Sequence, residues 1–148
     1  MLFRSLRKSL LLDVQNTPSE AANAMLARHT GNLQNLEFTP EGDCASVLLC
    51  SSEEKIEVRY DRITKRLAVL DAQGNEIGRW RGSVDDVDIG GEPIRFSCWL
   101  DHSLLELYLN DVKAVSLRNY FTQPRYFRVR GNVQTLQLWE LSPAYPEL

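Results

Sequence analysis

From Leu33 onward the sequence alternates apolar and polar residues with a period of two, and this pattern constrains the fold more than any other feature. Such alternation is typical of strands with one buried side and one solvent-facing side. Clusters rich in Gly, Asn, Asp and Pro interrupt it at short intervals. These short strands predict an antiparallel sandwich or barrel, because no helix-length segment separates them as in a parallel sheet. The expected strands are 33–39, 45–51, 55–60, 66–70, 76–81, 94–100, 104–109, 113–118, 125–130 and 133–141.

The clearest hairpin pattern lies within residues 94–117. Two apolar runs of strand length are separated by the polar tripeptide Asp101-His102-Ser103, which allows a tight turn. A second turn is indicated at Asn110-Asp111. The side chains expected on the buried face are Ile94, Phe96, Cys98, Leu100, Leu105, Leu107 and Leu109.

A short helix is predicted within residues 17–30. Thr17-Pro18-Ser19-Glu20 resembles a capping box, and Gly31 stands where a helix-ending glycine belongs. Residues 1–16 fit two conformations, because their leucines form a helical stripe while residues 9–14 also fit a strand. We therefore expect an N-terminal linker-like segment with a helix over 1–31 and a β-sandwich domain over 32–148.

Composition excludes several functions. The chain has 148 residues and a net charge of -3, which gives no electrostatic footprint for nucleic acid, whose binding normally needs a basic face. No apolar run has the length of a membrane-spanning helix or of an export signal. The three cysteines are odd in number and lack the spacing of a zinc site or a disulfide framework. We expect a cytoplasmic protein with free thiols, no metal and no cofactor.

The hairpin region also carries a recognisable signature. Residues 100–111 contain the pattern Asp-x-Ser-x-x-Glu-x-aromatic-x-Asn. This pattern resembles a motif in the C-terminal β-sandwich domain of glycoside hydrolase family 32, the invertase, fructanase and sucrose-6-phosphate hydrolase group. Similarity of pattern covers residues 32 to 141. The motif positions in this chain are Asp101, Ser103, Glu106, Tyr108, Asn110 and Arg118.

The resemblance implies a two-sheet antiparallel sandwich of the concanavalin A-like kind. It also implies that catalysis belongs to a separate propeller domain, whose carboxylates lie in Asn-Asp-Pro-Asn, Arg-Asp-Pro and Glu-Cys sequences. In this chain no proline follows an aspartate and no cysteine follows a glutamate. We therefore expect no catalytic residue here, and structural roles for the motif residues, such as an ion pair between Glu106 and Arg118.

Two sets of carboxylates are candidates for a chemical site. Retaining glycosidases need two carboxyl groups about 5–5.5 Å apart, and a tight turn between Asp101 and Glu106 could bring the two near that distance. Since both belong to the sandwich motif, we interpret them as structural. The loop with Asp85, Asp86 and Asp88 lacks the glycine and distal glutamate of an EF-hand, so we expect a solvated acidic loop.

Aromatic residues give the candidates for a carbohydrate site, since sugar sites combine aromatic faces with planar polar groups. Trp80 lies between Arg79 and Arg81, and Trp99 has the opposite parity to Phe96, so these tryptophans are expected to be exposed. Trp139 is interpreted as a core residue.

The leading functional hypothesis is a non-catalytic accessory sandwich, stand-alone or truncated, resembling that of sucrose and sucrose-6-phosphate hydrolases. One alternative is a free-standing carbohydrate-binding module for sucrose, a fructoside or a fructan. Another is an interaction domain that pairs with itself or with a separate propeller domain. The sequence leaves the sugar and the oligomeric state open.

Overall fold

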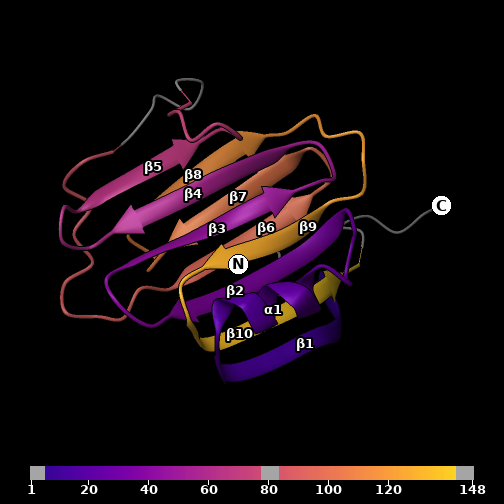
Figure 1. The fold of residues 1–148 in the computed structure, drawn as a ribbon, viewed down its shortest axis with the longest axis horizontal. Helices are drawn as coiled ribbons and strands as arrows, with labels where there is room; N and C mark the ends of the chain where they lie inside the picture. The colour runs from indigo at the N-terminus through magenta and orange to yellow at the C-terminus, as the bar shows by residue number, and fades with distance from the viewer. Residues whose placement is uncertain (1–5, 78–83, 143–148) are drawn as a thin grey trace.

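The computed structural model describes residues 6–77 and 84–142, which form an all-β fold with one short helix (Figure 1). Every strand pair is antiparallel. The predicted two-sheet antiparallel β-sandwich is confirmed. The elements are β1 (Arg7–Thr17), α1 (Ser19–Leu26), β2 (Leu33–Pro40), β3 (Cys44–Cys50), β4 (Lys55–Asp61), β5 (Arg66–Leu70), β6 (Phe96–Asp101), β7 (Leu104–Leu109), β8 (Lys113–Arg118), β9 (Tyr126–Arg130) and β10 (Val133–Leu141).

The two sheets differ in width, and the helix makes up the difference. The larger sheet has the order β1-β10-β2-β6-β7-β8, and the smaller has the order β5-β4-β3-β9. Figure 1 shows α1 beside β9, continuing the smaller layer over β10 and β1. Ala22 and Leu26 of α1 are fully buried in the same core as the inward-facing residues of both sheets. The helix therefore covers the part of the larger sheet's inner face that the four strands of the smaller sheet leave uncovered.

The core follows the predicted alternation. Phe38 of β2 and Phe96 of β6 stack with ring centroids 6.0 Å apart, in the arrangement that aromatic pairs prefer. The neighbouring inward-facing residues are the ones that the period of two selects. They include Leu36, Cys98, Leu100, Leu105, Leu107 and Leu138 of the larger sheet, and Val47, Leu49, Val58, Val69, Phe127 and Val129 of the smaller sheet.

The helix is confirmed, but its predicted ends are wrong. It begins at Ser19 with Pro18 as the N-cap residue and no side-chain cap, and it ends at Leu26 with Ala27 as the C-cap residue. Thr17 is still part of β1, and its hydroxyl donates to the carbonyl of Gln15 at 2.8 Å. The capping box does not form because the strand uses the residue that would supply the cap.

The first segment adopts the strand, one of the two conformations that the sequence left open. β1 pairs with β10 from Arg7↔Leu141 to Thr17↔Val133, as an edge strand of the larger sheet. Its register shifts twice, between Arg7 and Ser9 and between Leu10 and Leu12. Such irregularities insert a residue and break the alternation that marks a strand in the sequence. The expected domain division at residue 32 stays a prediction, although β1 lies in the sheet.

Both predicted hairpins are present. β6 pairs with β7 from Phe96↔Leu109 to Asp101↔Leu104, and β7 pairs with β8. The turn residues His102 and Asn110 have φ values of 52° and 49°, a conformation that Asn and His tolerate better than most residues. Of the expected strand 76–81, Glu76 forms an isolated bridge with Leu70, and residues 78–81 lie outside the described part.

No helix within residues 6–77 and 84–142 has the length and apolarity that crossing a membrane would require.

Candidate functional site

The first motif residues fasten the turn between β6 and β7. Asp101 Oδ1 lies 2.8 Å from Nδ1 of His102. The hydroxyl of Ser103 accepts a hydrogen bond of 3.3 Å from Arg118 Nη1. Arg118 therefore contacts Ser103 and not Glu106, the partner expected from the sequence. These contacts are local and join neighbouring turns and strands.

The remaining motif residues connect neighbouring strands and loops. The hydroxyl of Tyr108 donates to Glu106 Oε2 at 3.2 Å. The side chain of Asn110 donates to the carbonyl of Pro93 and accepts from the backbone N–H of Arg95, both at 2.7 Å. Asn110 thereby fixes the start of β6 to the β7–β8 turn. Burial and the neighbouring Glu106 carboxylate both raise the pKa of Tyr108, so its hydroxyl stays protonated.

Trp99 is not exposed, contrary to expectation. It points outward from the larger sheet, yet it is only 1% exposed. Arg7 of β1 covers it, with its guanidinium carbon 5.6 Å from the Trp99 ring centroid. The indole N–H of Trp99 donates to Ser97 Oγ at 3.1 Å. The other proposed sugar-binding residues, Arg79, Trp80 and Arg81, lie outside the described residues.

Trp139 is not a core residue, so that interpretation is also wrong. It is half-buried on the outer face of β10, because it directly follows Leu138, whose side chain points into the core. Arg7 lies 4.9 Å from its ring centroid and so stands between the two tryptophans. The same guanidinium donates to Asn35 Oδ1 at 2.9 and 2.6 Å and to Glu37 Oε1 at 3.0 Å. Arg7 thereby orders the outer face of the larger sheet.

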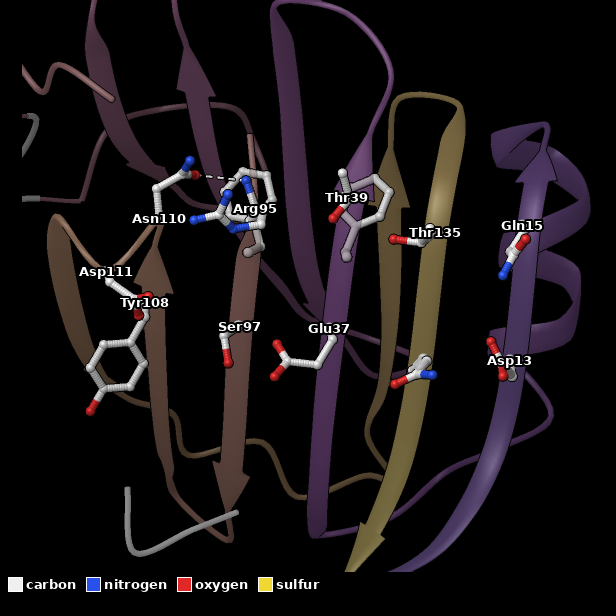
Figure 2. A pocket seen from close by; sticks show the side chains of 13 residues that line it. Asp13, Gln15, Glu37, Thr39, Arg95, Ser97, Tyr108, Asn110, Asp111 and Thr135 are labelled. Carbon is white, nitrogen blue, oxygen red and sulfur yellow. Dashed lines mark hydrogen bonds between the residues drawn. The ribbon is translucent and has the colours of Figure 1, made fainter. Parts of the chain in front are cut away.

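Next to this cluster, the outer face of the larger sheet forms a polar groove of about 400 Å³ (Figure 2). Its centre is a single row of cross-strand neighbours that runs over five strands of the sheet. Figure 2 shows the labelled members of this row pointing out of the sheet on the same side. The row, here called the polar row, consists of Asp13, Gln137, Glu37, Ser97 and Tyr108.

A second set of side chains borders the polar row at one end of the strands. Gln15, Thr39 and Thr135 lie on β1, β2 and β10, and Figure 2 places them above Asp13 and Glu37. Arg95 and Asn110 close the groove at the β7–β8 turn. The groove therefore offers carboxylate, amide, hydroxyl and guanidinium groups within one concave surface.

None of these groove residues was predicted as a sugar-binding residue, and Tyr108 and Asn110 were expected only as motif residues with structural roles. Asp13, Glu37 and Gln137 come from three strands that are far apart in the sequence. They meet because of the strand order and the register of β1, β10 and β2. Their outward parity was the one signal in the sequence that marked them as exposed polar residues.

Comparison with known proteins gives information on the fold. No family model matches this chain, and no curated protein sequence matches it either. Among solved structures, sucrose-6-phosphate hydrolase from Lactobacillus gasseri superposes with a TM-score of 0.70 and 15% identity, over 97% of this chain and 30% of the enzyme. The GH32 beta-fructofuranosidase of Bombyx mori gives 0.68 and 19%, over 98% of this chain and 29% of the enzyme.

A shorter protein has a related fold. Chicken galectin 2 superposes with a TM-score of 0.50 and 10% identity, over 88% of this chain and 99% of its own. This chain spans about 30% of the length of the two enzymes. Such coverage is consistent with the C-terminal sandwich domain of glycoside hydrolase family 32, and at these identities the likeness establishes the fold that the sequence motif had led us to expect.

Proposed function

We propose that this chain is a non-catalytic accessory β-sandwich that binds a fructose-containing saccharide in the groove of the larger sheet. The polar row carries the proposal. Its five members span four strand spacings of about 4.8 Å, roughly 19 Å in all. An extended row of this kind suits an oligosaccharide better than a compact ligand.

The chemistry of the row fits sugar hydroxyl groups, which donate and accept hydrogen bonds at once. Asp13 and Glu37 accept, whereas Gln137 and Ser97 do both. Tyr108 adds an aromatic ring at one end of the row. Because all five positions lie on paired strands, the binding groups are held in place before the ligand arrives, and this lowers the entropic cost of binding.

Arg7 supports the same proposal by fixing Glu37. Its ion pair with Glu37 Oε1 is 3.0 Å long, and the two side chains are 23% and 25% exposed. The carboxylate therefore keeps one orientation relative to Ser97 and Gln137. A polar group with a fixed direction is what gives a binding site its specificity.

The saccharide class comes from the fold comparison. The two similar enzymes are named for sucrose-6-phosphate and for beta-fructofuranosides. Their names describe whole proteins more than three times as long as this chain, so the transfer to this chain belongs to the proposal. Sucrose, a fructoside or a short fructan is the expected partner.

A docking domain has less support. The large apolar side chains that are exposed within the described residues lie at separate places: on β1, in the turns after β4 and β7, and after β8. Each lies on a different segment of the chain, whereas a protein interface is marked by a continuous apolar patch. They are Leu10, Ile63, Val112 and Tyr120.

Isothermal titration with sucrose, sucrose-6-phosphate, fructose and a short fructan tests the proposal, with reducing-sugar release assayed in the same samples. We expect heat of binding without release of reducing sugar. Gln137→Ala should weaken binding, while Gln134→Ala, an exposed glutamine of the same strand that does not line the groove, should not. Absence of binding to all four sugars would refute the saccharide site, and hydrolysis would refute the non-catalytic role.

A further inference from the structure

A larger groove, of about 650 Å³, lies on the opposite side of the molecule, between α1 and the outer face of the smaller sheet. Its walls come from α1 and from the outward-facing side chains of β9 and β4, with Leu48 of β3 on the floor. A volume of this size falls in the range of small-molecule sites, about 300–1,000 Å³. Three of its lining residues are cations, namely Lys55, Arg128 and Arg130.

The strand register explains why these cations gather. β3 runs between β4 and β9, and its outward residues are small or apolar, so the long side chains of both neighbours extend over it. Three cross-strand rows result on this outer face. The rows are Lys55-Cys50-Tyr126, Glu57-Leu48-Arg128 and Arg59-Ser46-Arg130.

A buried carboxylate organises part of this cluster. Glu57 is only 5% exposed, and its Oε2 accepts from Ser46 Oγ at 2.6 Å and lies 3.1 Å from Arg59. Its Oε1 lies 3.4 Å from Arg130 Nε. Glu57 therefore holds Arg130 through its Nε and not through the two terminal nitrogens of the guanidinium. A carboxylate this deeply buried persists only with such partners.

The remaining cations carry uncompensated charge. Within the described residues, Lys55 and Arg128 form no ion pair. Burial raises the pKa of the Cys50 thiol on β3, and Arg128, Lys55 and Arg130 each act against that rise, so all three cations lie near this thiol. The carboxylate of Glu20 on α1 lines the far wall of the groove.

We propose that this groove binds the phosphate group of a small phosphorylated ligand, with Arg128, Arg130 and Lys55 as the residues that contact the oxyanion. Guanidinium groups match phosphate oxygens through paired N–H donors, and a lysine adds a compact charge. Tyr126, half-buried at the edge of the groove, would pack against the organic part of the ligand. A phosphorylated saccharide and inorganic phosphate share this chemistry, so the test must separate them.

This inference is independent of the saccharide groove. The two grooves lie on different sheets and share no lining residue. Failure of one site therefore leaves the other intact, and variants in the smaller sheet report on the phosphate site alone.

Titration with inorganic phosphate, fructose 6-phosphate and fructose at low ionic strength tests the proposal. We expect inorganic phosphate and fructose 6-phosphate to bind saturably in the groove of the smaller sheet. Fructose, which has no phosphate group, should not bind in this groove. Arg128→Gln should weaken phosphate binding by about tenfold, the loss of one charge-assisted contact. Arg118→Gln, which removes an exposed cation from the larger sheet, serves as the matched control.

The relative affinities of the two phosphorylated probes and of the two variants test the phosphate site. Tighter binding of fructose 6-phosphate than of inorganic phosphate supports a phosphorylated saccharide, and equal binding supports the oxyanion alone as the recognised group. Absence of phosphate binding would overturn the proposal. So would equal weakening by Arg128→Gln and Arg118→Gln, because binding would then report net charge and not this groove.

Discussion

The guanidinium carbon of Arg7 lies 4.9 Å from the ring centroid of Trp139, and this contact links the edge strand β1 to the outer face of β10. The same guanidinium reaches Trp99, Asn35 and Glu37. Planar guanidinium groups are suited to stacking on aromatic rings while donating hydrogen bonds in their own plane. One residue thus connects the attachment of β1 to the orientation of a carboxylate in the proposed saccharide groove.

Arg7→Ala should lower the free energy of unfolding by about 2 kcal/mol, because it removes charge-assisted hydrogen bonds and leaves the buried Asn35 side chain without that donor. The free energy of unfolding of Arg7→Lys should fall between those of the unchanged protein and Arg7→Ala, since a lysine keeps the charge without the planar guanidinium. Urea unfolding followed by tryptophan fluorescence measures both. Lys8→Ala is the control, because its ion pair with Glu140 is exposed and 3.9 Å long. Equal stability of the Arg7→Ala and Lys8→Ala proteins would contradict this account.

The edge of β9 is closed by a helix side chain. Asn23 Nδ2 donates to the carbonyl of Val129 at 2.9 Å, and the N–H of Val129 donates to Asn23 Oδ1 at 2.8 Å. The amide group thus occupies the place of a neighbouring strand, which protects an edge that would otherwise be open to pairing. Asn23→Ala should cost about 1–3 kcal/mol, the penalty for leaving buried backbone groups unpaired.

Chemical denaturation of Asn23→Ala beside Ala21→Ser checks this prediction. Ala21 is exposed on the same helix, so its substitution samples helix propensity alone. A difference between the two variants that vanishes within error would show that the Asn23 bridge contributes nothing.

Stability should decline at alkaline pH because of Cys98. Burial, followed by the charge of Glu37, raises the pKa of this thiol well above 9.0, so the folded protein holds the proton more tightly than the unfolded chain does. The corresponding stabilisation is fully present below that value and is lost as the pH rises from it toward the folded pKa. The free energy of unfolding, measured across this pH range, should decline less steeply in the Cys98→Ala protein than in the Cys44→Ala protein. Parallel profiles would argue against the assignment.

The thiols should also differ in reactivity. Cys44 is exposed, whereas Cys50 and Cys98 are buried. A disulfide reagent added to the native protein should label Cys44 rapidly. It should label Cys50 and Cys98 only at the rate of unfolding, because a buried thiol is inaccessible until the chain opens. Mass spectrometry of the labelled peptides identifies the site. Rapid labelling of Cys98 in the native state would be incompatible with the buried position on β6.

Local pattern was sufficient to predict the strands that lie in regular pairs. The alternation of Phe96, Cys98 and Leu100 gave the buried face of β6, and the Asp101-His102-Ser103 break gave its turn. These features depend on neighbours in the sequence, where a period of two is directly visible.

The outer face of the larger sheet could not be predicted in this way. Trp99 has the parity of an exposed residue, yet it is buried, and Arg7 reaches its ring from a strand at the sheet edge. The two register shifts of β1 concealed that strand in the sequence. The polar row likewise depends on long-range register, which places Asp13, Gln137 and Glu37 side by side although no local motif joins them.

The most direct test of the account is a titration of the ¹⁵N-labelled protein with a short fructan, followed by amide chemical shifts. We expect saturable shifts along the polar row, at Asp13, Gln137, Glu37, Ser97 and Tyr108, with little change on β3, β4 and β9. Shifts confined to the smaller sheet, or no shifts at saturating fructan, would contradict a saccharide site on the larger sheet.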